Sequence, residues 1–148
     1  MYASQQKVGA FAETISRQFF EQRLSSPKIL YWSRYSDRVI TRVVPKQPLK
    51  VLDFTDNATQ ARLGATAQIM HSDDYSWTRK WACLSYNHPQ TPQGIRYTAR
   101  HAASTHSIAI FDRFGEVRFE RKESIPLTPK EIPCEILEYL DRAGFITC

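Results

Sequence analysis

Cysteine is scarce in this chain of 148 residues. The three cysteines, Cys83, Cys134 and Cys148, are widely spaced and form no C-x-x-C pair. An odd number at such spacing argues against a disulfide framework or a zinc site, and we expect two core thiols and one terminal thiol. The four histidines form no compact ligand motif, and no local motif supports a Cys–His nucleophile. We therefore predict no metal and no bound cofactor.

Long apolar runs are also absent. No stretch approaches the roughly 18 uncharged apolar residues that a membrane span requires. The opening segment, MYASQQKVGAFAE, lacks the basic start and apolar run of a signal peptide. We therefore expect a cytoplasmic protein without a membrane segment. The length, with 42% hydrophobic and 24% charged residues, fits one globular domain over residues 1–148.

Acidic residues are few between Arg17 and Lys50, where eight Lys and Arg face only Glu21 and Asp37. Three aromatic residues lie among them: Tyr31, Trp32 and Tyr35. A basic, aromatic-rich stretch can bind phosphates and stack bases. We favour a solvated basic face whose aromatic residues belong to the core, because no nucleic-acid-binding motif accompanies it.

The first predicted element is a helix over about residues 7–22. Apolar residues recur there with helical spacing, at Val8, Phe11, Ala12, Ile15 and Phe19. Glu13, Arg17 and Glu21 lie on the opposite face, which must meet solvent or a polar cleft. The helix begins so soon after Met1 that we expect no element before it.

The remaining pattern predicts an α+β fold, with a mixed sheet flanked by helices. Strands are expected at 38–44, 49–54, 94–98, 107–111 and 116–121. Helices are expected at 58–63, at 76–87 and from Pro133 to Arg142, the last with Ile136, Leu137 and Leu140 buried. In the helix at 76–87, Trp77, Trp81 and Leu84 share one face. The last two strands are predicted to form a hairpin across the turn at 112–115.

Three groups of segments carry a resemblance to a known family. The first runs from YAS at 2–4 to AFAE at 10–13. The second is LKVLDFTD at 49–56, followed by ARLG at 61–64. The third combines TRKWA at 78–82, GIRYTARH at 94–101 and IAIFDR at 108–113. In this order and spacing they resemble the RES-domain family, which consists of intracellular toxins related in fold to ADP-ribosyltransferases and named after an Arg, a Glu and a Ser.

The resemblance implies cleavage of NAD, in which nicotinamide is expelled and the ADP-ribosyl group passes to phosphate or water. Breaking the C–N bond develops positive charge on the ribose, as in glycoside hydrolysis. A nearby carboxylate stabilises that charge, and a cation holds the phosphates. By the resemblance, Glu13 takes the carboxylate position and Tyr2 that of an aromatic residue stacked on nicotinamide. The alternatives are a solvated Glu13 and a frayed Tyr2.

The chain departs from the family pattern at two places. The family's Arg lies upstream of the Y-x-A element, so we expect an N-terminally truncated domain with a partial ADP-ribosyltransferase-like fold. The family's Ser falls on Ala99, whose methyl group neither donates nor accepts a hydrogen bond. Thr98 points to the other face of its strand, and Ser104 lies in a loop. Arg100 and Arg96 are the candidate replacements for the phosphate-binding cation.

Three functions remain open. We favour a RES-domain protein that is weakened or inactive and still binds a partner, such as a helix-turn-helix antitoxin. The second is an active NAD-consuming toxin, with NAD as substrate. The third is a nucleic-acid-binding module on the basic 17–50 surface. A truncated core would expose a sheet edge and apolar surface, so we expect a homodimer or an aggregation-prone chain.

Overall fold

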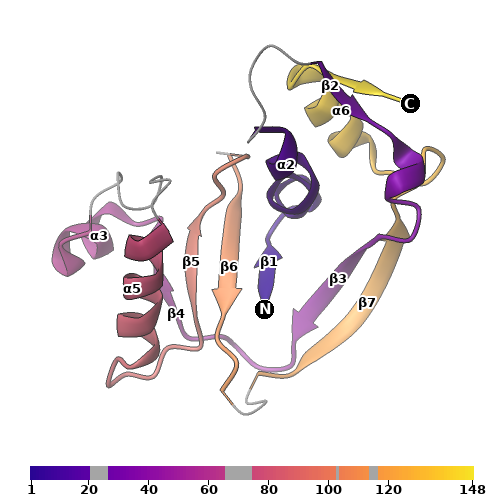
Figure 1. The fold of residues 1–148 in the computed structure, drawn as a ribbon. Helices are drawn as coiled ribbons and strands as arrows, with labels where there is room; N and C mark the ends of the chain where they lie inside the picture. Colours follow the sequence, from indigo (N-terminus) through magenta and orange to yellow (C-terminus); the bar gives the residue numbers. More distant parts are fainter. Residues whose placement is uncertain (21–26, 66–74, 103, 114–116) are drawn as a thin grey trace.

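The centre of the fold is a mixed four-stranded sheet with the strand order β1-β6-β5-β4 (Figure 1). Its strands are β1 (Tyr2–Ser4), β4 (Val51–Asp53), β5 (Gly94–Thr98) and β6 (His106–Ile110). Strand β6 runs antiparallel to both of its neighbours, whereas β4 runs parallel to β5. The computed structural model describes residues 1–20, 27–65, 75–102, 104–113 and 117–148.

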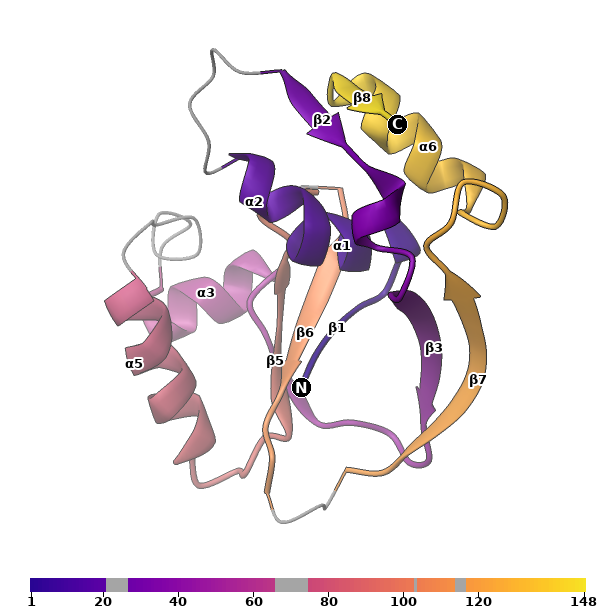
Figure 2. The ribbon, with the colours of Figure 1, turned by 45° about the vertical axis from the view of Figure 1, so that its right-hand side comes forward.

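Two further strand pairs lie outside this sheet. Strand β3 (Val39–Pro45) pairs antiparallel with β7 (Phe119–Pro126), and β2 (Lys28–Leu30) pairs parallel with β8 (Phe145–Thr147). Figures 1 and 2 show the β3–β7 ribbon beside β1 without joining the central sheet. The predicted hairpin between 107–111 and 116–121 is therefore wrong, because the second segment becomes part of β7 and pairs with a strand about 80 residues earlier.

Seven helical segments are described. They are α1 (Lys7–Phe11), the π-helix η1 (Ala12–Ser16), α2 (Arg17–Phe20), the 3₁₀ turn η2 (Trp32–Arg34), α3 (Asn57–Leu63), α5 (Tyr75–Tyr86) and α6 (Cys134–Arg142). The first three form one continuous helix up to residue 20, where residues 7–22 were predicted helical; 21–26 lie outside the described part. Strand β1 precedes this helix, so the expectation that no element comes before it is wrong.

The main core lies where the N-terminal helix meets α6. Phe11 and Ile15 pack with Ile136 and Leu140 in one cluster of buried side chains. Burying each such side chain contributes about 1.5–3 kcal/mol. Leu137 was expected in this core but is 41% exposed, because Ile136 and Leu140 already occupy the single stripe of α6 that faces inward.

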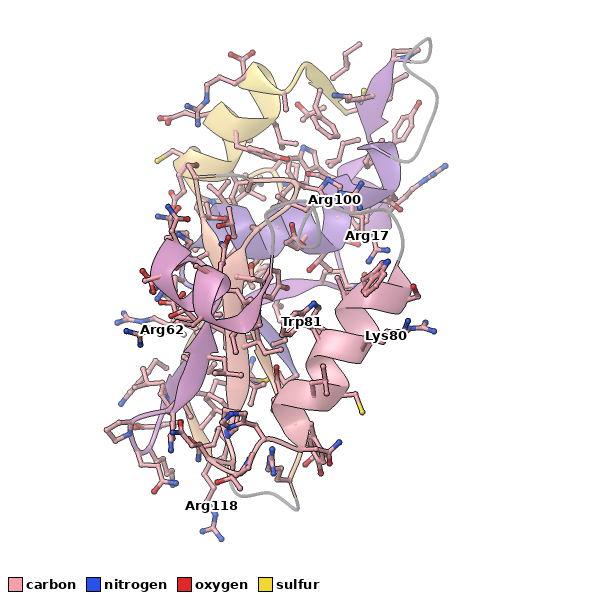
Figure 3. The ribbon with its side chains drawn as sticks, turned by 90° about the vertical axis from the view of Figure 1, so that its left-hand side faces the viewer. Arg17, Arg62, Lys80, Trp81, Arg100 and Arg118 are labelled. Atoms are coloured by element: carbon pink, nitrogen blue, oxygen red, sulfur yellow. The ribbon has the colours of Figure 1, made fainter. Side chains whose placement is uncertain are left out.

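A second cluster lies under α3 and α5. Phe54 and Ile95 are buried there, with Trp81 packed against them; Figure 3 shows Trp81 pointing from α5 toward the sheet. Trp77 and Leu84 share the helix but are 49% and 63% exposed. Helix α5 therefore contacts the sheet along a narrower stripe than its sequence suggests.

The cysteines do not behave as predicted. All three are free and exposed, so the expectation of two core thiols is wrong. Cys83 lies on α5 away from its buried stripe, Cys134 is the first residue of α6, and Cys148 ends the chain. A small apolar side chain is buried only where its position faces a packed neighbour, and composition alone does not reveal this.

The aromatic residues of the basic stretch are mostly structural. Trp32 is buried in the main core, and Tyr35 packs against that core. Tyr31 is exposed, with the Arg34 guanidinium over its ring. This arrangement agrees with the interpretation as a solvated face and leaves Tyr31 as the one exposed aromatic residue of the three.

Candidate functional site

The N-terminal helix approaches the sheet closely. A Cβ atom on Gly9 would lie 2.2 Å from Ser4 Oγ and 2.6 Å from Thr105 Oγ1, so only glycine permits this contact. The helix then loosens into the π-turn η1, which contains Glu13. Such turns are rare and occur frequently at functional sites, because they redirect side chains that a regular helix would point elsewhere.

Glu13 is half-buried and contacts the segment that follows β5. Its Oε1 accepts a hydrogen bond of 3.0 Å from the backbone N–H of His101. The His101 carbonyl in turn accepts one of 3.1 Å from the Tyr139 hydroxyl on α6. Among the described residues, this is the one hydrogen bond that the Glu13 carboxylate makes.

Tyr97 lies beside this carboxylate. The strand register places Tyr97 opposite Ser107, and Ser107 opposite Ser4, so the three share one face of the sheet; Tyr2 lies two residues along on the same face. Burial raises the pKa of Tyr97 to about 12, with further contributions from the Glu13 carboxylate and from Tyr2. Glu13 and Tyr2 therefore both lie close enough to act on Tyr97 electrostatically.

Tyr139, on α6, also lies near Glu13. Burial raises the pKa of its hydroxyl above the ordinary value, and the Glu13 carboxylate raises it further. The hydroxyl therefore stays protonated and can donate to the His101 carbonyl. Tyr2, by contrast, is 81% exposed and leaves its ring open to solvent.

Ala99 packs beside the turn that carries Glu13. It is fully buried in a cluster with Ala12 and Ala102, and Tyr139 packs against the same cluster. Because Ala12 immediately precedes Glu13, the position where the resemblance places a serine touches the turn that carries the carboxylate. In this chain that position offers no polar group.

Arg96 already contacts Asp53 and His106. Its Nη1 donates to Asp53 Oδ2 at 2.8 Å, and its Nη2 lies 3.0 Å from His106 Nδ1. Burial raises the pKa of Asp53, but hydrogen bonds from Thr55 and from Arg96 outweigh this and hold the pKa below its usual value. Alternation along β5 also puts Arg96 on the face opposite Tyr97. Arg96 therefore ties β4 to β5 and is a poor candidate for the phosphate-binding cation.

Two other arginines lie near the N-terminal helix that carries the carboxylate. Strand β5 ends at Thr98, so strand alternation no longer directs Arg100, which is exposed and directly precedes His101. Arg17 begins α2, one helical turn after Glu13. Figure 3 shows both at the same end of the molecule, beside the N-terminal helix. Arg17 was not predicted as a site residue, although its four-residue spacing from Glu13 is a usable signal.

Several features are absent from the described part of the chain. None of its helices is long and apolar enough to cross a membrane. Within the same residues, no three His, Cys, Asp or Glu side chains gather as metal ligands would.

The comparisons with known proteins give the class of protein. The sequence profile of the RES domain matches residues 1–129, which is most of the chain. The chain therefore belongs to the RES domain family, which is associated with NAD-related toxins. No curated protein and no solved structure matched the chain. The kinship to ADP-ribosyltransferases and the lack of an upstream Arg segment stay predictions.

Proposed function

We propose that this RES-domain protein binds NAD at Glu13 and cleaves it at a rate weakened by Ala99. The hydrogen bond from the His101 amide to the Glu13 carboxylate, beside Tyr97, carries this proposal. In the reaction the bond between ribose C1′ and the nicotinamide nitrogen breaks, and its electrons leave with nicotinamide. An oxygen of water or phosphate then bonds to C1′ and completes the transfer of ADP-ribose.

The chain supplies three groups for this chemistry. The Glu13 carboxylate, oriented by the His101 N–H, stabilises the positive charge that develops on the ribose. The exposed Tyr2 ring provides a surface for the nicotinamide. Arg100, with Arg17 on the neighbouring helix, provides positive charge for the two phosphates.

The weakening follows from position 99. Loss of a single hydrogen-bond donor from a site of developing charge typically costs about 10²–10³ in rate. The Ala99 methyl group is fully buried against the turn that carries Glu13, where a serine hydroxyl would be able to hydrogen-bond to that turn and orient the carboxylate. A slow enzyme is therefore the expected state of this chain.

Release of nicotinamide from NAD tests the proposal. We expect slow release by the wild type and a loss of about 100-fold or more in Glu13→Gln, which keeps the shape of the side chain. Glu138→Gln, on an exposed glutamate of α6, is the matched control and should match the wild type. Equal rates for Glu13→Gln and the wild type would refute the role of Glu13.

A fully active toxin is the second candidate, and the two arginines near the N-terminal helix favour it. The two candidates differ in rate at the same site, so expression in cells separates them. An active toxin would deplete cytoplasmic NAD and arrest growth, and a helix-turn-helix antitoxin would relieve the arrest and co-purify with the chain. The weakened enzyme would leave cellular NAD near its normal level.

A further inference from the structure

A cleft of about 1000 Å³ lies between β1 and β3, and residues of the N-terminal helix line it as well. Consecutive residues line it along the segments at 1–7 and 38–43, whereas β6 contributes the alternate residues Ile108 and Ile110. Consecutive residues face a cleft where a strand presents its edge, and alternate residues where it presents a face. The cleft therefore has two strand edges as walls and apolar faces of β6 and β7 as a floor.

Within the described part of the chain, no strand pairs with β1 on this side. Met1 and Ile110 exchange backbone hydrogen bonds of 2.8 and 2.7 Å, and the Gln5 N–H donates to the His106 carbonyl at 3.0 Å. Because bonding direction alternates in an antiparallel pair, the N–H and C=O groups of Tyr2 and Ser4 point away from β6. They face the cleft.

Among the same described residues, no second strand pairs with β3 either. The Arg38 carbonyl accepts from Leu127 at 3.0 Å, and the Lys46 N–H donates to Arg118 at 2.9 Å, so even-numbered residues of β3 bond toward β7. The intervening residues with outward N–H groups are Val39, Thr41 and Val43. The next such position is Pro45, which has no N–H and suits an edge strand.

We propose that this cleft binds an extended segment of another polypeptide chain, which adds a strand between β1 and β3. One strand pairing with both edges would satisfy two rows of backbone groups at once. Its apolar side chains would lie on Ile110, Phe119 and Ile125, which line the floor. The proposal does not depend on NAD chemistry, because Ile108 and Ile110 lie on the face of β6 opposite Ser107 and Tyr97.

The charged side chains that line the cleft indicate the charge of the partner. Its lining contains Lys7, Arg38 and Arg42 against Glu123 alone, because the acidic partners of Lys7 and Arg38, Glu135 at 3.5 Å and Asp37 at 3.7 Å, lie outside the lining; acidic side chains therefore complement the rim. A second copy of the chain would offer either the three-residue β1 or a β3 that carries the same arginines. An apolar and acidic strand from a different chain fits better than either.

A synthetic peptide of about ten residues, alternating valine and glutamate, is the probe. Amide hydrogen exchange by NMR should slow at Tyr2, Ser4, Val39, Thr41 and Val43 when the peptide binds. The same peptide with lysine in place of glutamate should bind more weakly. N-methylation at alternate residues removes the N–H donors from one edge of the peptide. Such a peptide should slow amide exchange along only one of the two strands, β1 or β3.

Thr41→Pro removes one outward donor and leaves the β7 ladder intact, so it should weaken binding about tenfold. Thr41→Val is the matched control: it loses the 2.9 Å contact with the Ser124 hydroxyl but keeps its N–H, and should bind like the wild type. Should Thr41→Pro unfold β3, the N-methylated peptide still tests the wild type. Three results would each overturn the proposal. They are unchanged exchange at these amides with the peptide, equal peptide binding by Thr41→Pro and the wild type, and slower amide exchange at higher protein concentration without peptide, as in a dimer.

Discussion

At the scale of single residues, position 99 decides how the Glu13 site works. Ala99 is fully buried against the turn that carries Glu13, and its methyl group offers no hydrogen bond. We predict that Ala99→Ser raises the rate of nicotinamide release by about tenfold to a hundredfold, because the added hydroxyl can hydrogen-bond to the turn that carries Glu13 and orient the carboxylate. Steady-state kinetics would show the gain in kcat.

The matched control for this change is Ala102→Ser, which adds a hydroxyl to the same alanine cluster. It should not raise the rate. A rate for Ala99→Ser at or below that of the wild type would show that the missing serine does not limit this chain.

The pKa of Tyr97 tests the position of the Glu13 carboxylate without a measurement of catalysis. Its pKa of about 12 lies above the value of about 10 for an unfolded tyrosine, so the folded state holds the proton more tightly. The free energy of unfolding should therefore fall as pH rises from about 10 to 12. In Glu13→Gln the pKa of Tyr97 should move down toward 10, while the part due to burial remains.

Ultraviolet titration of the wild type against Tyr97→Phe isolates this one phenol among seven tyrosines. The same comparison within the Glu13→Gln background gives the shift. An unchanged titration of Tyr97 in that background would place the carboxylate too far away to matter.

The motifs predicted some site residues and not others. The resemblance pointed to Glu13 and Arg100, and the structure bonds Glu13 to the amide of His101, the residue after Arg100. Arg96 stands in the same motif but is bonded to Asp53, a partner that follows only from the parallel pairing of β4 and β5. Tyr139 lies 38 residues beyond His101, and no local pattern connects them.

At the scale of elements, the contact of α1 with β1 sets the position of Glu13. We predict that Gly9→Ala lowers the free energy of unfolding by about 1–3 kcal/mol, because its Cβ would overlap Ser4 Oγ and Thr105 Oγ1. Chemical denaturation would measure the loss. Nicotinamide release should fall as well, because the helix must shift away from the His101 segment.

A double variant checks the cause. Ser4→Ala removes the nearer of the two overlaps, so Ser4→Ala with Gly9→Ala should recover part of the stability lost by Gly9→Ala alone. Strictly additive effects would mean that the two residues do not meet and that the helix lies elsewhere.

Elements with strong local signals were predicted well. The α3 helix begins after Asp56, whose side chain accepts from the Thr59 N–H at 2.8 Å, and it ends at Gly64. Strand β5 occupies the predicted residues 94–98. The β6–β7 hairpin failed because strand alternation fixes which side chains share a face but not which strand is the partner. Periodicity did not predict strand β1, because three residues are too few to show it, and only the family's Y-x-A strand end indicated a strand at this place.

At the scale of the whole molecule, the sequence predicted an α+β fold with a mixed sheet, and the structure confirms it. It did not predict that β3 and β7 would form a separate ribbon with a cleft beside β1 (Figure 2). Such long-range pairings depend on loop closure and packing across the chain, which short sequence windows do not contain. The apolar floor of the cleft and the Tyr97 side of the carboxylate site lie on opposite faces of the central sheet, and Tyr2 is the site residue that also lines the cleft.

The most direct test of the NAD site is amide NMR of the wild type titrated with carba-NAD, whose C–N bond to nicotinamide resists cleavage. The account predicts saturable shifts that are largest at the amides of Tyr97, Arg100 and His101, with the same residues unmoved in Glu13→Gln. Shifts confined to other parts of the chain, or none at saturating ligand, would contradict it.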